Sequence, residues 1–148
     1  MSTLNPNESA GYLANQMARL FAVQLAEALT PLNLATAQFA VLMHLWQQDQ
    51  RTQSELAACI GLEQATMANT LARMERDGLI ERHPHPADRR AQMIHLTQRA
   101  KDLQEPATST ANNVNAQTLS PLSEQEQQQL VSLMTRVIQH QLAWRAGR

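Results

Sequence analysis

Residues able to bind a polyanion are concentrated between Gly78 and Thr97, in the segment GLIERHPHPADRRAQMIHLT. An apolar pair precedes a charged tip broken by prolines, and a second apolar run, Met93–Leu96, returns from it. This alternation predicts a β-hairpin. Its tip carries Arg89 and Arg90, and guanidinium groups are attracted by the negative potential of a DNA minor groove. The sequence therefore predicts a hairpin with a cationic tip that fits such a groove.

The cationic side chains are unevenly distributed along the chain. The formal net charge of the 148 residues is −1, so the overall composition does not indicate a nucleic-acid ligand. However, seven of the 12 Lys and Arg residues lie within a short stretch: Arg73, Arg76, Arg82, Arg89, Arg90, Arg99 and Lys101. The acidic residues of that stretch offset only part of this charge. Because the local field matters more than net charge for DNA contact, this segment is the expected contact surface.

The first third of the chain has the periodicity of two amphipathic helices. One spans about residues 9–29, with an apolar stripe from Leu13 to Ala28, and Pro31 ends it because proline disfavours helical geometry in the preceding residue. The second spans about residues 35–48. Its expected buried side chains are Phe39, Leu42, Met43 and Trp46.

The next two helices have the spacing of a helix–turn–helix. Thr52 to Glu55 form a capping box that starts a short helix through Ile60. Gly61 supplies the permissive backbone of a tight turn. A further helix of about residues 63–77 is expected to bury three side chains, Met67, Leu71 and Met74.

If those three side chains are buried, the opposite face of that helix is polar and suited to a major groove. Gln64 and Asn69 have amides that can bond bidentately to adenine edges, and Arg73 can contact phosphate or guanine. Threonine side chains can bond phosphate or touch a thymine methyl. The expected DNA-facing set is Gln64, Ala65, Thr66, Asn69, Thr70 and Arg73. An ordinary solvated helix face is the alternative, and the following hairpin favours DNA.

Two further helices are expected after the hairpin. Thr97 can cap a helix that runs toward Ser120, with Pro106 kinking it. A second capping box, Ser123 to Glu126, starts the last helix. Its apolar stripe comprises Leu130, Leu133, Met134, Val137, Ile138 and Leu142.

This element order predicts a mostly α fold with a small β-hairpin, namely a winged helix–turn–helix between terminal helices. Residues 35–97 would form the DNA-binding lobe, and residues 9–34 and 98–146 the dimerisation helices. Two amphipathic helices at opposite chain ends cannot both bury a full stripe against one small core. Pairing across a two-fold axis covers them and spaces two recognition helices about one DNA turn apart. A monomeric helical bundle is the alternative.

Several segments resemble the MarR family of bacterial transcription regulators. They are Leu34–Leu42 (LATAQFAVL), Ile60–Leu62, Leu71–Arg82 (LARMERDGLIER), and Asp88–Arg90 followed by Ile94–Thr97. The hairpin motif is the most specific, and the likeness extends over about residues 10–142. The segment Ile60–Leu71, IGLEQATMANTL, is also similar to the SlyA branch of that family.

The resemblance implies a homodimer whose terminal helices interlock and which binds a pseudo-palindromic operator in double-stranded DNA. Arg90 matches the family's minor-groove arginine, with Arg89 beside it, and Asp88 would brace the hairpin by ion pairing with neighbouring arginines. The likeness also implies a repressor released by a small aromatic or phenolic effector. The sequence leaves activation, the operator and the effector's identity open.

The chain departs from the family pattern at three positions. Ala35 stands where a capping threonine is common, which weakens that helix start. Ala100 replaces a frequent glycine after the hairpin. Asn69 stands where many relatives have arginine, so the bases read by this helix can differ from theirs.

Cys59 is the only cysteine, so no intrachain disulfide can form, which fits a reducing cytoplasm. We expect it to be a small buried thiol, with oxidation sensing through Cys59 as an alternative. The five histidines lack a neighbouring Cys or carboxylate cluster, so no metal site and no cofactor is expected.

Other classes of function have little support in the sequence. The start, MSTLNPNES, has no secretory pattern, and no apolar run approaches about 20 residues, so a cytoplasmic chain without membrane contact is expected. An enzyme is not expected, since the chain has no P-loop, G-x-S-x-G, H-E-x-x-H or dinucleotide fingerprint. A winged-helix module that binds protein instead of DNA is a second alternative.

Overall fold

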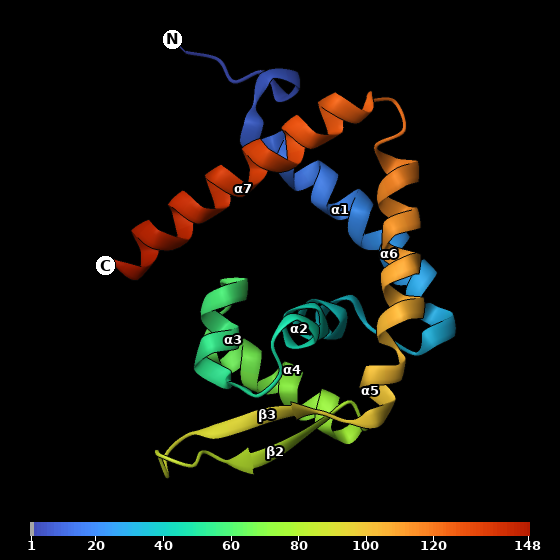
Figure 1. The fold of residues 1–148 in the computed structure, drawn as a ribbon. Helices are drawn as coiled ribbons and strands as arrows, with labels where there is room; N and C mark the ends of the chain where they lie inside the picture. The colour runs from blue at the N-terminus through green and yellow to red at the C-terminus, as the bar shows by residue number, and fades with distance from the viewer. Residues whose placement is uncertain (1) are drawn as a thin grey trace.

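The computed structural model describes residues 2–148 and consists of two layers (Figure 1). Helices α2 to α4 and a small sheet form one lobe, and α6 connects it to α1 and α7 in the other layer. The elements are η1 (Pro6–Glu8), α1 (Ala10–Leu29), η2 (Thr30–Leu32), α2 (Thr36–Gln47), β1 (Arg51–Thr52), α3 (Gln53–Ile60), α4 (Gln64–Arg76), β2 (Ile80–Pro84), β3 (Gln92–Leu96), α5 (Gln98–Asp102), α6 (Gln104–Thr118) and α7 (Glu124–Ala146). The predicted fold class, a mostly helical winged helix–turn–helix, is therefore confirmed.

The sheet is antiparallel and has three strands in the order β1-β3-β2. The hairpin register runs from Ile80 opposite Leu96 to Pro84 opposite Gln92. Strand β1, whose Arg51 pairs with Ile94, was not predicted from the sequence. Two residues are too few to show an alternation of apolar and polar side chains. The strand forms because this segment pairs with an edge of β3.

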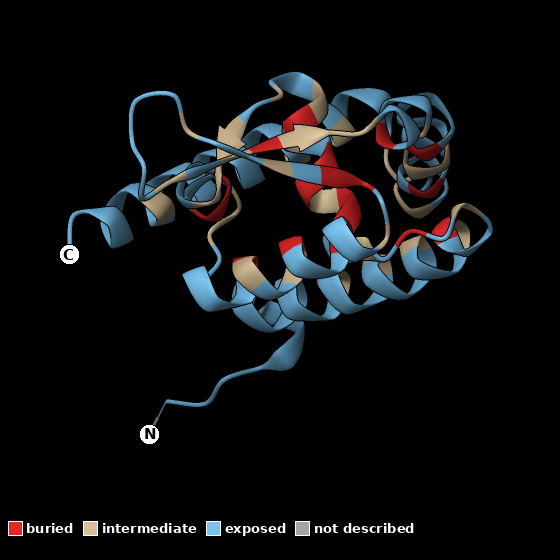
Figure 2. Ribbon diagram, turned by 90° about the horizontal axis from the view of Figure 1, so that it is seen from below, coloured by how far each residue is buried: buried red, intermediate tan, exposed pale blue. Residues whose placement is uncertain are grey.

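The core lies where α2, α3 and α4 meet the sheet, as the buried segments of Figure 2 show. Its fully buried side chains come from the three helices and the hairpin and include the three expected from α4. They are Val41, Leu42, Leu45, Leu56, Met67, Leu71, Met74, Leu79, Ile80 and Ile94. Burial of a large aliphatic side chain contributes about 1.5–3 kcal/mol, so this lobe has a core of its own.

Local signals set most element ends as expected. Thr52 accepts a hydrogen bond from the backbone N–H of Glu55 at the start of α3. Of the predicted capping box only this half forms, since within residues 2–148 the Glu55 carboxylate makes no hydrogen bond back to the N–H of Thr52. Gly61 follows α3 with φ of 81° and Gly78 follows α4 with φ of 74°. This left-handed region is accessible to glycine at low cost. At the start of α7, Ser123 and Glu126 form the predicted reciprocal capping box.

The helix expected from Thr97 to Ser120 is divided into α5 and α6 at Leu103. The break falls one turn before Pro106 and has a simple cause. Proline has no N–H to donate to the carbonyl of Asp102, and its ring crowds that carbonyl.

Met43 was expected on the buried side of α2 but is 45% exposed. Of the other expected side chains, Phe39 and Leu42 are buried and Trp46 is half-buried, and Val41 and Leu45 are buried in addition. Met43 shares an i, i+4, i+7 stripe with Phe39 and Trp46, and this stripe faces a shallow cavity toward α6. The helix thus has a second apolar side, which a single-stripe interpretation merges with the first.

None of the helices in residues 2–148 is by itself long and apolar enough to cross a membrane. The segments Ala10–Leu32 and Thr36–Gln47, bent by 77°, meet that test of length and composition only as a pair.

Gln38 connects the start of α2 to the end of α4. Its side chain is 6% exposed, and its Oε1 accepts from the backbone N–H of Ala35 at 3.1 Å. This bond is the Gln38 half of a capping box, and Ala35 has no side-chain acceptor to supply the other half. Gln38 Nε2 donates to Asp77 Oδ2 at 2.8 Å. That hydrogen bond, followed by one from Arg76, holds the pKa of Asp77 below its ordinary value.

We expect Gln38→Leu to lower the free energy of unfolding by about 1–3 kcal/mol at pH 7, because two polar groups lose their partner. Urea denaturation measures it. Because the pKa of Asp77 is lowered in the folded state, its ionised carboxylate stabilises the fold above the unfolded-state pKa, and this contribution is lost as pH falls. The difference in free energy of unfolding between variant and wild type should therefore shrink below pH 3.8, the ordinary pKa of this carboxyl group.

Gln47→Leu is the matched control, since this glutamine lies on the same helix but is exposed. Equal effects of the two substitutions at pH 7 would contradict the role assigned to Gln38.

Candidate nucleic-acid interface

Helix α4 presents a polar face to solvent. Met67, Leu71 and Met74 are fully buried, which confirms the predicted orientation of this helix. The opposite face is available for contact: Gln64, Ala65, Thr66, Asn69 and Arg73 are exposed and Thr70 is half-buried.

Hydrogen bonds fix part of this face. Gln53 of α3 donates through Nε2 to Gln64 Oε1 at 3.2 Å, which joins the N-terminal ends of α3 and α4. The Gln64 amide retains its N–H donors. Thr70 donates its hydroxyl to the carbonyl of Thr66 at 3.0 Å, leaving the oxygen free to accept. The face combines amide, hydroxyl and guanidinium groups of the types that contact base edges and phosphates.

The hairpin tip is held by hydrogen bonds to its own backbone. His85 Nδ1 accepts from the N–H groups of Ala87 and Asp88 at 3.0 and 3.1 Å. Asp88 Oδ1 accepts from the N–H of Arg90 at 2.9 Å. These bonds order the loop while both tip arginines, Arg89 and Arg90, stay exposed.

Asp88 therefore does not act as the sequence predicted. We expected it to orient neighbouring arginines by ion pairing, but no ion pair in the part of the chain from residue 2 to 148 includes it. A short carboxylate in a tight loop reaches the backbone N–H two residues on more readily than a long arginine side chain. Asp88 thus braces the tip through backbone geometry.

Arg82 is a cationic residue that the predicted site did not include. It lies on β2 opposite Ile94, and its side chain is only 23% exposed. Its Nε is 3.7 Å from Glu75 Oε2 and has no hydrogen-bond partner. The alternation of side chains along a strand could have indicated this burial. Arg82 is two residues after the buried Ile80, so it occupies an inward-facing strand position.

Two histidines and a glutamate meet on another part of the hairpin. The rings of His83 and His95 have centroids 4.2 Å apart, and His83 Nε2 lies 3.3 Å from Glu81 Oε2. Within the described residues, no group of three or more His, Cys, Asp or Glu side chains is arranged to hold a metal ion.

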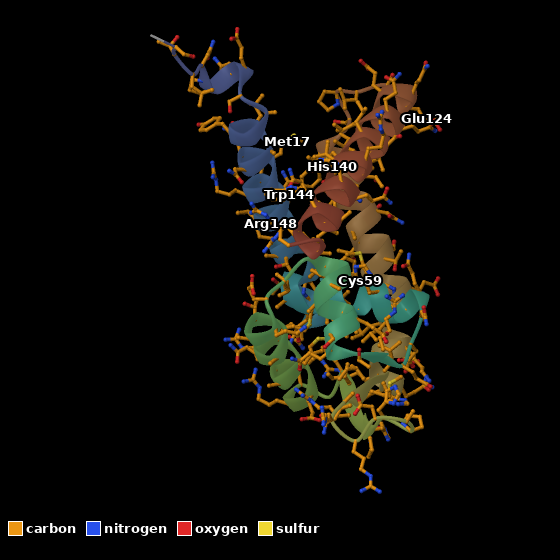
Figure 3. All side chains as sticks on the ribbon, turned by 90° about the vertical axis from the view of Figure 1, so that its left-hand side faces the viewer. Met17, Cys59, Glu124, His140, Trp144 and Arg148 are labelled. Carbon is orange, nitrogen blue, oxygen red and sulfur yellow. The ribbon has the colours of Figure 1, made fainter. Side chains whose placement is uncertain are left out.

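Cys59 was expected to be buried, and it is exposed. It lies at the end of α3 that is nearest to α7 (Figure 3). Ile60, four residues after the buried Leu56, continues the inward side of this short helix, and Cys59 falls beside it. Arg51 Nη1 is 3.3 Å from the Cys59 sulfur.

A second surface of interest is apolar and lies on α1 and α7. Helix α7 has no buried residue along its 23 positions (Figure 2). The large exposed apolar side chains of the two helices are Leu13, Leu20, Val23, Val131, Leu133, Met134, Val137 and Ile138. An apolar surface of this extent typically marks an interaction site.

The helix pair α3–α4, the hairpin packed against α4, and the cationic tip together define a winged helix–turn–helix protein. Residues 34–91 match the model of the MarR family.

Comparison with solved structures agrees with this class. A probable transcriptional regulator from Pseudomonas aeruginosa is 27% identical, with a TM-score of 0.83 over 90% of this chain and 99% of that one. Apo wild-type MarR from E. coli is 25% identical, with a TM-score of 0.74 over 87% and 96% of the two chains. CouR from Rhodococcus jostii RHA1, bound to p-coumaroyl-CoA, shares the fold at 20% identity, with a TM-score of 0.80 over 95% and 96%. The chain thus has the fold of MarR-family transcription regulators.

Proposed function

We propose that this protein is a member of the MarR family that binds a pseudo-palindromic operator in duplex DNA as a homodimer. The observation that carries the proposal is the exposed polar face of α4 next to a hairpin whose tip exposes Arg89 and Arg90. The matched transcription regulators support this reading over an enzyme. Such a regulator acts in the cytoplasm, and the similarity of residues 60–71 to the SlyA branch remains a prediction.

The proposed contacts divide between two grooves. The α4 set would enter the major groove: Gln64, Ala65, Thr66, Asn69, Thr70 and Arg73. Arg90, with Arg89 beside it, would enter the flanking minor groove, and Asp88 would keep the tip in shape through the Arg90 N–H. Base contacts would then come mainly from α4, and the hairpin would recognise the shape of the minor groove.

The proposed dimer uses residues 9–34 and 98–146, with residues 35–97 as the DNA-binding lobe. The exposed apolar side chains of α1 and α7 support this division, since a second copy would cover them. Two-fold symmetry would also match two recognition helices to two half-sites.

The proposed effector is a small aromatic or phenolic molecule. A cavity of about 310 Å³ between α2 and α6 supports this class. Phe39 and Trp46 line it, and their rings meet edge to face with centroids 5.9 Å apart. Gln104 and Asn112 supply amides. No charged side chain is among the cavity's described lining residues, which favours a phenol over an acid. CouR, which shares the fold, was crystallised with p-coumaroyl-CoA.

Selection of bound fragments from random duplexes tests the proposed function. We expect a two-fold symmetric consensus and an affinity that falls steeply with added salt, because cationic side chains displace counterions from phosphates. Asn69→Ala should change the preferred central bases while leaving the salt dependence nearly unchanged, since an amide reads bases without carrying charge.

Asn113→Ala, an exposed asparagine on α6, is the matched control and should keep the wild-type consensus. Absence of duplex affinity at low salt would exclude the proposal and favour a protein-binding module.

A further inference from the structure

A cavity of about 490 Å³ lies between the hairpin and the N-terminal end of α3. We propose that it binds a phosphodiester group of the DNA backbone, with Arg82 as its main ligand. This inference rests on the proposed DNA-binding function and adds a backbone contact by Arg82 next to the groove contacts of Arg89 and Arg90. The lining residues come from three places in the chain: Thr52, Gln53, Ser54, Arg82, Asp88 to Gln92, and Ile94.

The lining of this phosphate cavity is strongly cationic. Arg82, Arg89 and Arg90 face one acidic residue, Asp88. The Asp88 carboxylate already accepts a hydrogen bond from the N–H of Arg90, so part of its negative charge is compensated within the loop. The planar fork of an arginine matches two phosphate oxygens, which makes an arginine-rich cavity a suitable anion site.

Arg82 is the member of this lining whose hydrogen bonding within the chain is incomplete. Its Nε is the one buried side-chain nitrogen or oxygen within residues 2–148 that has no hydrogen-bond partner. The Glu75 carboxylate, at 3.7 Å, lies beyond hydrogen-bond distance and is itself half exposed. Glu75 thus pairs with Arg82 by charge alone, and a buried N–H without a hydrogen-bond acceptor is costly. A phosphate in the cavity would add a second negative charge and hydrogen-bond acceptors beside this guanidinium.

The start of α3 adds donors to the same cavity. Thr52 uses its hydroxyl oxygen to accept from Glu55 N–H, so the earlier N–H groups of Gln53 and Ser54 have no acceptor within the helix. The partial positive charge of a helix N-terminus favours an anion at this position. The Ser54 side chain is exposed and can donate its hydroxyl.

The cavity is also coupled to the recognition helix. Gln53, which lines it, donates to Gln64 at the first position of α4, and Glu75 near the end of α4 faces Arg82. A phosphate held here would therefore fix the depth and register at which α4 meets the bases. We assign the phosphate to DNA because Ser54, Arg89 and Arg90 are exposed at the cavity, which leaves it open to a polymer.

Binding measurements with Arg82→Gln test the site. We expect about a tenfold loss of affinity that is uniform across duplex sequences, and a slope of log Kd against log salt that is shallower by about one. Arg82→Lys should lose less, because it keeps the charge without the fork. Ser54→Glu, which places a negative charge in the cavity, should lose more than tenfold. Arg148→Gln, an equal change of charge at an exposed position after α7, should keep wild-type affinity and slope.

The outcomes separate this inference from the proposed function. If wild type binds no duplex, the proposed function fails. If wild type binds with a steep salt slope and Arg82→Gln keeps that slope, only the phosphate cavity is overturned. A changed base consensus in Arg82→Gln would also overturn it. If Arg82→Gln unfolds, Ser54→Glu decides, and wild-type affinity in that variant would overturn the inference.

A free anion is the other source of the same chemistry. Thermal unfolding of wild type in inorganic phosphate, compared with chloride at equal ionic strength, detects it. One result would assign the cavity to a free anion and overturn the DNA assignment. In that result, phosphate stabilises wild type but not Arg82→Gln, and Arg82→Gln keeps the wild-type slope of log Kd against log salt.

Discussion

Val137→Glu is expected to convert the proposed dimer to a monomer and to weaken operator binding by about 10²- to 10⁴-fold, the range gained when two linked sites bind together. Val137 lies on α7 and is 63% exposed in the single chain, so the carboxylate meets no packed neighbour there. In a dimer that covers this face, the same carboxylate would be buried without a partner. The folded chain should therefore persist while association is lost. Sedimentation velocity and duplex titration measure the two effects.

Gln139→Glu is the matched control for this experiment. It adds the same charge to α7, at an exposed position that does not belong to the apolar stripe. We expect it to stay dimeric and to bind normally. A Val137→Glu variant that remains dimeric by sedimentation would exclude α7 as the dimer surface, and circular dichroism would verify that both variants fold.

Arg90→Ala is expected to reduce operator affinity by about 1–3 kcal/mol, with the largest loss at operators that have A·T-rich flanks. Its backbone N–H is held by Asp88 while its side chain is exposed, so the guanidinium projects from an ordered loop. A narrow A·T-rich minor groove concentrates negative potential on such a group. Titration of paired duplexes that differ only in their flanks measures both affinity and preference.

Lys101→Ala removes one positive charge from exposed α5 and should leave the flank preference unchanged. Unchanged affinity and unchanged flank preference in Arg90→Ala would exclude this arginine from the minor groove. A loss that is equal for all flanks would instead mean a phosphate contact.

Strong local patterns were sufficient to predict most elements. The hairpin was predictable because apolar alternation and a proline-rich tip act over neighbouring residues. The buried side of α4 followed from Met67, Leu71 and Met74 at helical spacing. A kink at Pro106 was expected, whereas the structure divides the helix at Leu103, next to the carbonyl that the proline obstructs.

Other features depended on partners distant in sequence. Met43 lines a second side of α2 because α6 passes there. Cys59 is exposed because α3 packs only the side that includes Leu56. The hydrogen bond from Gln38 to Asp77 joins residues 39 positions apart. None of these could be derived from periodicity within a single element.

The sequence by itself determined the order of the main helices and the hairpin, the inward face of the recognition helix and the cationic hairpin tip. These depend on backbone preferences and side-chain spacing that act over a few residues. Only the tertiary structure decided that Asp88 bonds to backbone and that Arg82 is buried without a partner beside the start of α3. Those outcomes depend on which segments the fold brings together, because burial and hydrogen-bond partners are properties of the surroundings and not of the residue.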